Sequence, residues 1–129
     1  LPTRRSRVRA PLPAPVFMSD LADKKCVACE GNIPAFNYEE IHKYLKKVDG
    51  WDVKSNNGKS FYLLKEFKFK DFKESQLFVN KVGGIAEKEN HHPDIFFGWG
   101  YCKIKIFTHA IDGLAESDFI LAAKIDKLS

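Results

Sequence analysis

The sequence lacks a long apolar run. Its 129 residues are 44% hydrophobic and 13% aromatic, but lysines interrupt the apolar stretches every few positions. Because a membrane-spanning helix needs about 20 consecutive apolar residues, we expect a chain with no membrane partner. The length and the hydrophobic content suit a single domain with one buried core.

Cysteine is scarce as well. The three cysteines, Cys26, Cys29 and Cys102, are odd in number and too few for a disulfide framework, which favours a reducing environment. Cys26 and Cys29 form a lone CxxC pair, whereas a zinc site needs a second pair or a histidine pair at ligand spacing. We interpret the pair as two thiols in an N-terminal loop, without an assigned role.

Acidic residues are absent from residues 1–17, which contain four arginines and four of the six prolines. This segment has no hydrophobic periodicity, so we predict a disordered tail at 1–17 and one domain at 18–129. The segment starts at Leu and Met18 would open a more ordinary N-terminus, so three interpretations stay open: an artificially added segment, an upstream translated leader, or an Arg-rich, acid-free targeting peptide. We expect a cytoplasmic protein, or a nuclear or organellar one if the tail is native.

The tail also accounts for the net charge of +4. The chain has 21 basic and 17 acidic residues, and with the four tail arginines set aside the remainder is neutral. A neutral body lacks the one-sign field that binding to a phosphate backbone requires. Nucleic acid is therefore not expected as a direct partner.

Capping signals and apolar spacing predict a first helix and a hairpin. Asn37 and Glu40 have capping-box spacing and begin a helix that Gly50 ends. Its apolar face consists of Ile41, Tyr44, Leu45 and Val48. The Asn56-Asn57-Gly58 turn between residues 51–53 and 60–69 predicts an antiparallel strand pair.

A long helix follows the hairpin. Asp71 and Glu74 repeat the capping-box spacing, and Pro93 prevents the helix from continuing past the residue before it. Gly83-Gly84 inside the helix costs about 1 kcal/mol per glycine relative to alanine, which indicates close packing against a neighbour. The apolar residues assigned to its inner side are Phe72, Leu77, Phe78, Val82, Ile85 and Ala86.

The rest of the sequence predicts a strand, a turn, a second strand and a helix. Residues 94–97 and 101–108 flank a Gly98-Trp99-Gly100 turn, and the last helix is expected at residues 117–127. Two hairpins separated by a helix predict an α+β fold in the order αββαββα. In this fold a four-stranded antiparallel sheet carries the helices on one face.

Two of the four histidines, His91 and His92, stand together where the long helix must end. His109 follows the last strand, and an antiparallel sheet can bring a strand end next to a helix end. We expect a three-histidine cluster, with Glu87 one turn before His91 and Asp118 in the first turn of the last helix. A nearby carboxylate orients an imidazole and raises its basicity, and histidine changes charge near neutral pH.

Two other interpretations of the histidines stay open. Each histidine alone could hold a surface or helix-end position, where an imidazolium meets the helix dipole. Three histidines and a carboxylate could bind zinc, although adjacent histidines rarely direct both rings at one ion and the HExxH spacing is absent. The sequence contains no Ser-His-Asp order, Walker loop or dinucleotide fingerprint. Proton transfer by histidines without a metal, a cofactor or a covalent nucleophile fits these residues best.

One spaced pattern of these residues runs through the second half of the chain. It consists of an acidic residue, a His-His-Pro run, an aromatic residue, a further histidine and an aspartate. The pattern resembles that of the pterin-4a-carbinolamine dehydratases, and the resemblance extends over residues 21–128. Its positions here are Glu87, His91, His92, Pro93, Trp99, His109 and Asp118.

Ala115 departs from the pattern of these dehydratases, in which Thr or Ser is common at that position. A hydroxyl there would cap the last helix, a contribution of about 1 kcal/mol. We therefore expect Ser117 or Asp118 to cap this helix one turn later.

The resemblance implies a chemistry and a set of partners. Such dehydratases remove water from 4a-hydroxytetrahydropterin, the 4a-carbinolamine, and give quinonoid dihydropterin in tetrahydrobiopterin recycling. The implied substrate is a small pterin, the implied assembly is a homodimer or homotetramer, and no cofactor is implied.

The resemblance also implies roles for the site residues. We expect His91 to be the main acid-base group, His92 and His109 to contact the pterin and share the proton transfer, and Glu87 to tune a histidine. Asp118 would support His109 or the polar edge of the ring. Asn90, Pro93 and Trp99 complete the expected substrate contacts.

A binding role is the alternative function. Family members in animals also act as dimerisation cofactors of a homeodomain transcription factor, so a non-catalytic, coactivator-type binding module would resemble this chain equally well. A pterin-binding accessory protein and a metal protein are further possibilities. A pure binding module, however, has no need to keep Glu87, His91, His92 and His109 together.

Overall fold

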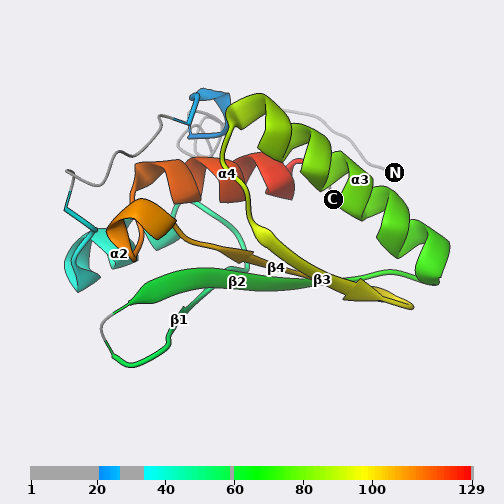
Figure 1. The fold of residues 1–129 in the computed structure, drawn as a ribbon, viewed down its shortest axis with the longest axis horizontal. Helices are drawn as coiled ribbons and strands as arrows, with labels where there is room; N and C mark the ends of the chain where they lie inside the picture. The colour runs from blue at the N-terminus through cyan, green and yellow to red at the C-terminus, as the bar shows by residue number, and fades with distance from the viewer. Residues whose placement is uncertain (1–20, 27–33, 59, 129) are drawn as a thin grey trace, which may run out of the picture.

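A computed structural model describes residues 21–26, 34–58 and 60–128. It has a four-stranded antiparallel sheet with helices packed on one face, which confirms the predicted α+β class (Figure 1). The tail predicted at 1–17 and Cys29 lie outside the described residues. The labelled elements are α2 (Tyr38–Leu45), β1 (Asp52–Ser55), β2 (Phe61–Lys68), α3 (Phe72–Glu89), β3 (Asp94–Gly98), β4 (Tyr101–Ile106), the 3-10 helix η1 (His109–Ile111) and α4 (Glu116–Asp126).

The sheet has the strand order β1-β2-β4-β3, and all neighbouring strands are antiparallel. The two predicted hairpins form its halves, joined where β2 pairs with β4. Trp99 and Gly100 make the tight turn between β3 and β4, and Gly100 supplies the positive φ of 81° that this turn requires. The strand after this turn ends at Ile106, two residues earlier than expected, and Thr108 pairs instead with Gly113 in an isolated bridge.

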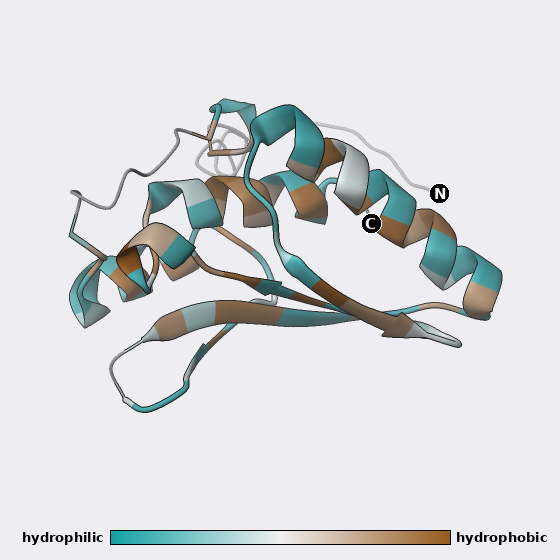
Figure 2. Ribbon diagram, in the orientation of Figure 1, coloured by the Kyte–Doolittle hydropathy of each residue, from teal (hydrophilic) through white to brown (hydrophobic). Residues whose placement is uncertain are grey.

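The core lies between the sheet and α4. Figure 2 shows brown, hydrophobic segments on the strands and on α4, where the two layers meet. Helix α4 is buried almost all round, because the sheet lies on one side and both α2 and α3 pack against it. Fully buried side chains from both layers include Leu63, Ile104, Ile106, Phe119, Leu121 and Ile125.

One charged residue on the inner face of the sheet connects it to the end of α4. Lys65 has the same parity as Leu63 and donates to Asp126 at 2.8 Å and to the carbonyl of Asp49 at 2.6 Å. The indole nitrogen of Trp51 donates to the same Asp126 carboxylate at 3.0 Å. Since every partner is hydrogen-bonded, the partly buried charges are compensated.

Helix α2 begins as expected, with a complete capping box between Asn37 and Glu40, but it ends earlier. Its last residue is Leu45, and Gly50 lies beyond it with a positive φ of 79°, in the turn into β1. Ile41 and Val48 are buried as predicted. The apolar spacing therefore continues past the helix, into a turn that packs on the same core.

Three predictions about α3 are corrected. Phe72 and Leu77 are 45% and 51% exposed, so neither lies on the buried side. The Asp71 side chain accepts from the Glu74 backbone, but the Glu74 carboxylate accepts from Lys70 instead of closing the box. Gly83 and Gly84 do not mark close packing, since within the described part of the chain a Cβ at either position would meet nothing within 4 Å.

The predicted shift of the last helix is also wrong. Helix α4 starts at Glu116 with Ala115 in the N-cap position, and neither Ser117 nor Asp118 acts as a later cap. Asp118 is the third helical residue, and its carboxylate accepts from the backbone N–H of Ala115 at 2.8 Å. This contact is one half of a capping box, and it fixes the helix start without a hydroxyl at position 115.

Candidate active site

The histidines meet at a cleft of about 410 Å³ beside the end of the sheet. One wall is the turn between α3 and β3, and the other is the chain that leaves β4 and enters η1. Two segments far apart in the sequence thus face one another, as predicted. The lining residues are Asn90, His91, His92, Pro93, Asp94, Phe107, Thr108, His109 and Ala110.

Asn90 turns the chain out of α3. It adopts the left-handed conformation with φ 54° and ψ 41°. The N–H of Asn90 donates to Glu87, and the N–H of His91 donates to Ala86 at 3.2 Å. This pair of bonds is a Schellman motif, in which asparagine is one of the few residues that tolerate the left-handed position. The helix therefore ends at Asn90, three residues before Pro93, the residue that was predicted to end it.

His91 is held by a buried carboxylate. Its Nε2 lies 2.8 Å from Oδ1 of Asp118, whose side chain is fully buried, while the His91 side chain is 15% exposed. The other oxygen, Oδ2, accepts from the hydroxyl of Thr108 and from the N–H of Ala115, each at 2.8 Å. Because Asp118 accepts from every partner, Nε2 of His91 carries the proton, and Nδ1 is left to receive one.

This contact corrects one expected partnership. Asp118 was predicted to support His109 or the polar edge of a ligand, but it binds His91. Glu87 was placed on the helix face of His91, but it pairs with His92, which follows the left-handed turn. Both histidines follow the left-handed residue Asn90, so the helical spacing from Glu87 no longer decides which of them it meets.

His92 has the opposite environment. Its Nε2 lies 2.5 Å from Oε2 of Glu87, and the two side chains are 53% and 79% exposed. Water competes with this contact, so it orients the ring less firmly than the buried contact of His91 does. Adjacent residues thus present one rigidly held imidazole and one solvated imidazole to the same cleft.

His109 comes from the other wall. It is the first residue of η1, is exposed, and its ring lies 4.2 Å from the ring of Phe107 between centroids. Within the described residues, no hydrogen bond engages its imidazole. The turn that carries it is fixed by the Thr108–Gly113 bridge and by the hydroxyl of Ser60, which donates to Asp112 at 2.7 Å.

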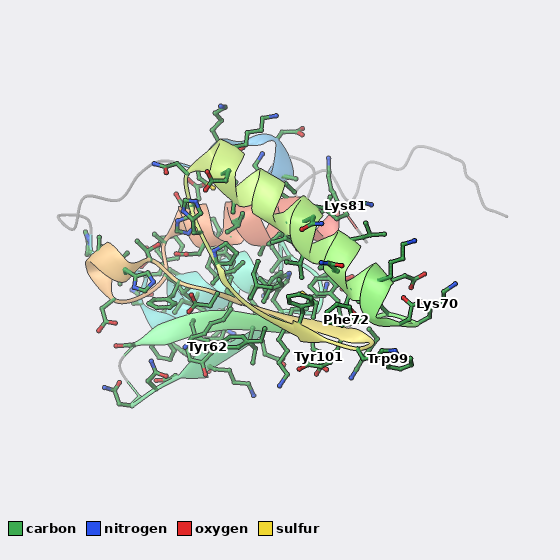
Figure 3. The ribbon with its side chains drawn as sticks, turned by 45° about the vertical axis from the view of Figure 1, so that its right-hand side comes forward. Tyr62, Lys70, Phe72, Lys81, Trp99 and Tyr101 are labelled. Carbon is green, nitrogen blue, oxygen red and sulfur yellow. The ribbon has the colours of Figure 1, made fainter. Side chains whose placement is uncertain are left out.

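Trp99 is the predicted site residue that the fold does not bring to this cleft. It is 71% exposed at the tip of the β3–β4 hairpin, as Figure 3 shows, and five residues of β3 separate it from Pro93. At about 3.3 Å per residue, this strand carries it well away from the histidines of the same chain. The other predicted residues line the cleft, except Glu87 and Asp118, which touch the histidines from behind.

Thr108, Phe107 and Asp94 were missed by the sequence analysis. Thr108 is buried, and nothing in the sequence showed that its hydroxyl meets Asp118. Asp94 directly follows Pro93 and Phe107 lies two residues before His109, so a search of the residues around each histidine could have found both.

The described residues contain neither a candidate metal site nor a candidate membrane-spanning helix. In the described ranges, no group of three or more His, Cys, Asp or Glu side chains is arranged to hold a metal ion. Among the same residues, no helix is both long enough and apolar enough to cross a membrane. Cys102 is a buried free thiol, and burial raises its pKa to about 11.

Comparison with solved structures places the fold. The chain is similar, with a TM-score of 0.66 and 29% identity, to a transcriptional coactivator/pterin dehydratase from Brucella melitensis, with coverage of 73% of this chain and 97% of that one. It is also similar, with a TM-score of 0.52 and 25% identity, to a pterin dehydratase-like protein described as a RuBisCO assembly factor in the alpha-carboxysome. That match covers 61% of this chain and 88% of the other.

Sequence comparison gives closer relatives. A protein of Rubrobacter xylanophilus is 49% identical over 86% of this chain and all of its own length, and one of Alkaliphilus metalliredigens is 47% identical over 85% of this chain and 96% of its own. Both carry the name "Putative pterin-4-alpha-carbinolamine dehydratase". Residues 34–128 match the family model described as pterin 4 alpha carbinolamine dehydratase. The chain therefore belongs to the pterin 4 alpha carbinolamine dehydratase family.

Proposed function

We propose that this protein dehydrates 4a-hydroxytetrahydropterin to quinonoid dihydropterin in the recycling of tetrahydrobiopterin. The observation that carries the proposal is the cleft itself. It presents three imidazoles from two walls, one of them bound to a fully buried carboxylate. Acid-base chemistry at neutral pH needs groups of this kind.

The reaction requires one proton to be delivered and one to be removed. The C4a–O bond breaks, and the oxygen leaves as water after it accepts a proton. The proton on N5 passes to a base, and the N5 electron pair forms the C4a=N5 double bond. The histidines therefore end with the same total number of protons, so neither a metal nor a cofactor is needed.

His91 is the main proton-transfer group in this proposal. Its Nδ1 is available to take up a proton, and the imidazolium that forms is stabilised by the buried carboxylate of Asp118. His92 and His109 are more exposed, contact the pterin and share delivery of the proton to the hydroxyl. Glu87 holds and tunes His92.

The remaining lining residues form the walls for the pterin ring. Pro93 and Asn90 border it on the α3 side, and Phe107 offers an aromatic wall on the other. Trp99, also predicted to contact substrate, would reach a pterin only in an assembly that brings the hairpin tip of one copy to the cleft of another. The homodimer or homotetramer that the resemblance implies would have to be such an assembly, and light scattering of the purified protein measures which one forms.

Single histidine variants test the proposal. The rate of dehydration of freshly generated 4a-hydroxytetrahydropterin is measured for His91→Ala, His92→Ala and His109→Ala. We expect His91→Ala to lose about 10²- to 10⁴-fold in rate, the usual contribution of a positioned acid-base group. His92→Ala and His109→Ala should lose less.

The fourth histidine is the matched control. His42 lies on α2, is exposed and makes an edge contact with Tyr38, outside the cleft. His42→Ala should keep the wild-type rate. A wild-type rate in His91→Ala would remove His91 from the mechanism, and the large loss in His92→Ala alone would move the main role one residue along.

A binding role is the second candidate function. It is favoured by the two solved relatives, of which one is described as a coactivator and the other as an assembly factor. A binding surface does not depend on the cleft histidines. Loss of partner binding in a variant with normal dehydration, or the reverse, would separate the two functions.

A further inference from the structure

The cleft contains one carboxylate that the proposed proton transfer does not use. Asp94 is the first residue of β3, lines the cleft together with the histidines and is exposed. Within the described residues, no hydrogen bond or ion pair engages its side chain. A carboxylate with open acceptor positions in a ligand-sized cleft is able to receive donors from a ligand.

The lysine expected to pair with Asp94 contacts aromatic rings instead. Asp94 stands opposite Lys105 in the β3–β4 register, a position at which opposite charges usually pair. The Lys105 ammonium instead lies over the rings of Tyr62 and Phe107, at 4.3 and 5.4 Å from their centroids. The cross-strand cation therefore does not neutralise the Asp94 carboxylate.

The other two carboxylates at the site are already committed. Glu87 binds His92, and the buried Asp118 accepts from His91, Thr108 and Ala115. Asp94 is thus the one acidic side chain lining the described cleft whose oxygens accept from no donor among the described residues.

A pterin has a group that matches such a carboxylate. Its pyrimidine ring carries a 2-amino group next to the N3–H, two donors that point the same way, as in a guanidinium. A carboxylate accepts such a pair through two parallel hydrogen bonds. A 2-oxo analogue, a lumazine, has an acceptor in place of the amino group and would oppose the carboxylate.

We propose that Asp94 binds the 2-amino-pyrimidinone edge of the substrate and selects pterins over their 2-oxo analogues. Asp94 is three residues from His91, so their Cα atoms are at most about 11 Å apart. A bicyclic ring between them meets Asp94 at its pyrimidine edge and His91 at its reacting C4a–N5 side. This inference rests on the proposed function, since it assigns the recognition of the same substrate.

Fluorescence titration with 7,8-dihydropterin and 7,8-dihydrolumazine tests the inference by binding alone. Wild-type protein should bind the pterin more tightly than the lumazine. Asp94→Asn should weaken pterin binding about 10- to 100-fold, the value of a charge-assisted hydrogen-bonded pair, and change lumazine binding little. In turnover, the same variant should show a raised KM with kcat largely kept.

Asp52→Asn is the matched control. Asp52 is an exposed carboxylate on β1, at the opposite edge of the sheet, and does not line the cleft. It should keep the wild-type preference for the pterin. If Asp94→Asn keeps that preference while the wild type dehydrates its substrate, the inference fails and the proposed function stands. If wild-type protein binds neither compound and does not accelerate dehydration, the proposed function fails and the inference with it.

Discussion

At the scale of single residues, the two adjacent histidines differ in what holds them. His91 is fixed from behind by a fully buried carboxylate that accepts three hydrogen bonds. His92 is paired with an exposed carboxylate. The same pair of residue types therefore produces a rigid contact at one position and a solvated contact at the next.

Because Asp118 is buried and Glu87 is exposed, neutralising Asp118 should lower kcat more than neutralising Glu87. Asp118→Asn should lower kcat about a hundredfold or more, because the amide neither stabilises the His91 imidazolium nor fixes its tautomer. Glu87→Gln, the matched change on the exposed pair, should lower kcat less than about tenfold. The measurement is kcat for both variants at neutral pH, with circular dichroism to verify folding. Equal losses would show that burial does not distinguish the two histidines.

Glu89 gives a prediction about stability and pH. Its buried carboxylate accepts from the N–H of Cys26 at 3.0 Å and lies 3.7 Å from the Lys124 ammonium, and the Cys26 N–H, followed by the charge of Lys124, lowers its pKa. A lowered pKa in the folded state stabilises the protein above the unfolded value of about 4.3. That contribution is lost as the pH falls through the lower, folded pKa.

Glu89→Gln should therefore reduce the free energy of unfolding at pH 7 and flatten its decline on acidification below about pH 4.3. Urea unfolding at several pH values measures both effects. Glu39→Gln, an exposed change on α2, should leave the curve unaltered. A Glu89→Gln curve parallel to that of the wild type down to pH 3 would contradict the assignment.

The residue scale is also where the sequence was least informative. The identity of the acidic and histidine residues indicated acid-base chemistry, but not that Asp118 would meet His91 or that Glu87 would meet His92. These partnerships depend on the left-handed turn at Asn90, and asparagine adopts that conformation only at some of its positions. Asn90 was predicted as a substrate contact, and its role in ending the helix was not recognised.

At the scale of elements, the C-terminal end of α3 belongs to the candidate active site, whereas the two glycines in the interior of the helix have no identified role. Its C-terminal turn orients the histidines, whereas Gly83 and Gly84 have no close neighbour among the described residues. Glycine in a helix interior is destabilising relative to alanine by about 0.5–1 kcal/mol. Nothing within the described part of one chain offsets this cost.

Gly84→Ala should therefore stabilise the isolated chain by about 0.5–1 kcal/mol. Gly84 is the better site because it is exposed and helical, so the added methyl group meets no atom. Chemical denaturation at low protein concentration measures the change. A loss of stability that grows with protein concentration would show that a second copy packs on this face of α3.

Local signals predicted most elements because caps and turns act within a few residues. The Asn37 and Asp71 caps and the Asn57-Gly58 turn all lie where they were expected. The apolar face of α3 was less predictable, because Phe72, the first residue of the helix, is 45% exposed although its ring lies 5.5 Å from that of Phe97 on β3. The start of α4 was misplaced because Asp118 satisfies the Ala115 N–H from inside the helix, a contact that also serves the active site.

At the scale of the whole molecule, the fold brings two distant segments to one end of the sheet. The α3–β3 turn and the β4–η1 turn are adjacent in space because β3 and β4 pair antiparallel. The order αββαββα was predictable from hairpin signals, and with it the meeting of His109 with His91 and His92. Within the described residues, helices cover only one face of the sheet, and the other face carries Tyr62 (Figure 3). The described part of a single chain gives no partner to this open face or to the exposed Trp99, and an assembly of several copies would provide one.

The most direct test of the whole account is the acceleration of dehydration by wild-type protein. Freshly generated 4a-hydroxytetrahydropterin is mixed with the protein, and formation of quinonoid dihydropterin is followed against the spontaneous rate. The account predicts a large acceleration that disappears in a folded His91→Ala/His92→Ala double variant and persists in His42→Ala. A spontaneous rate in the presence of well-folded wild-type protein would contradict the account and leave a binding role for this fold.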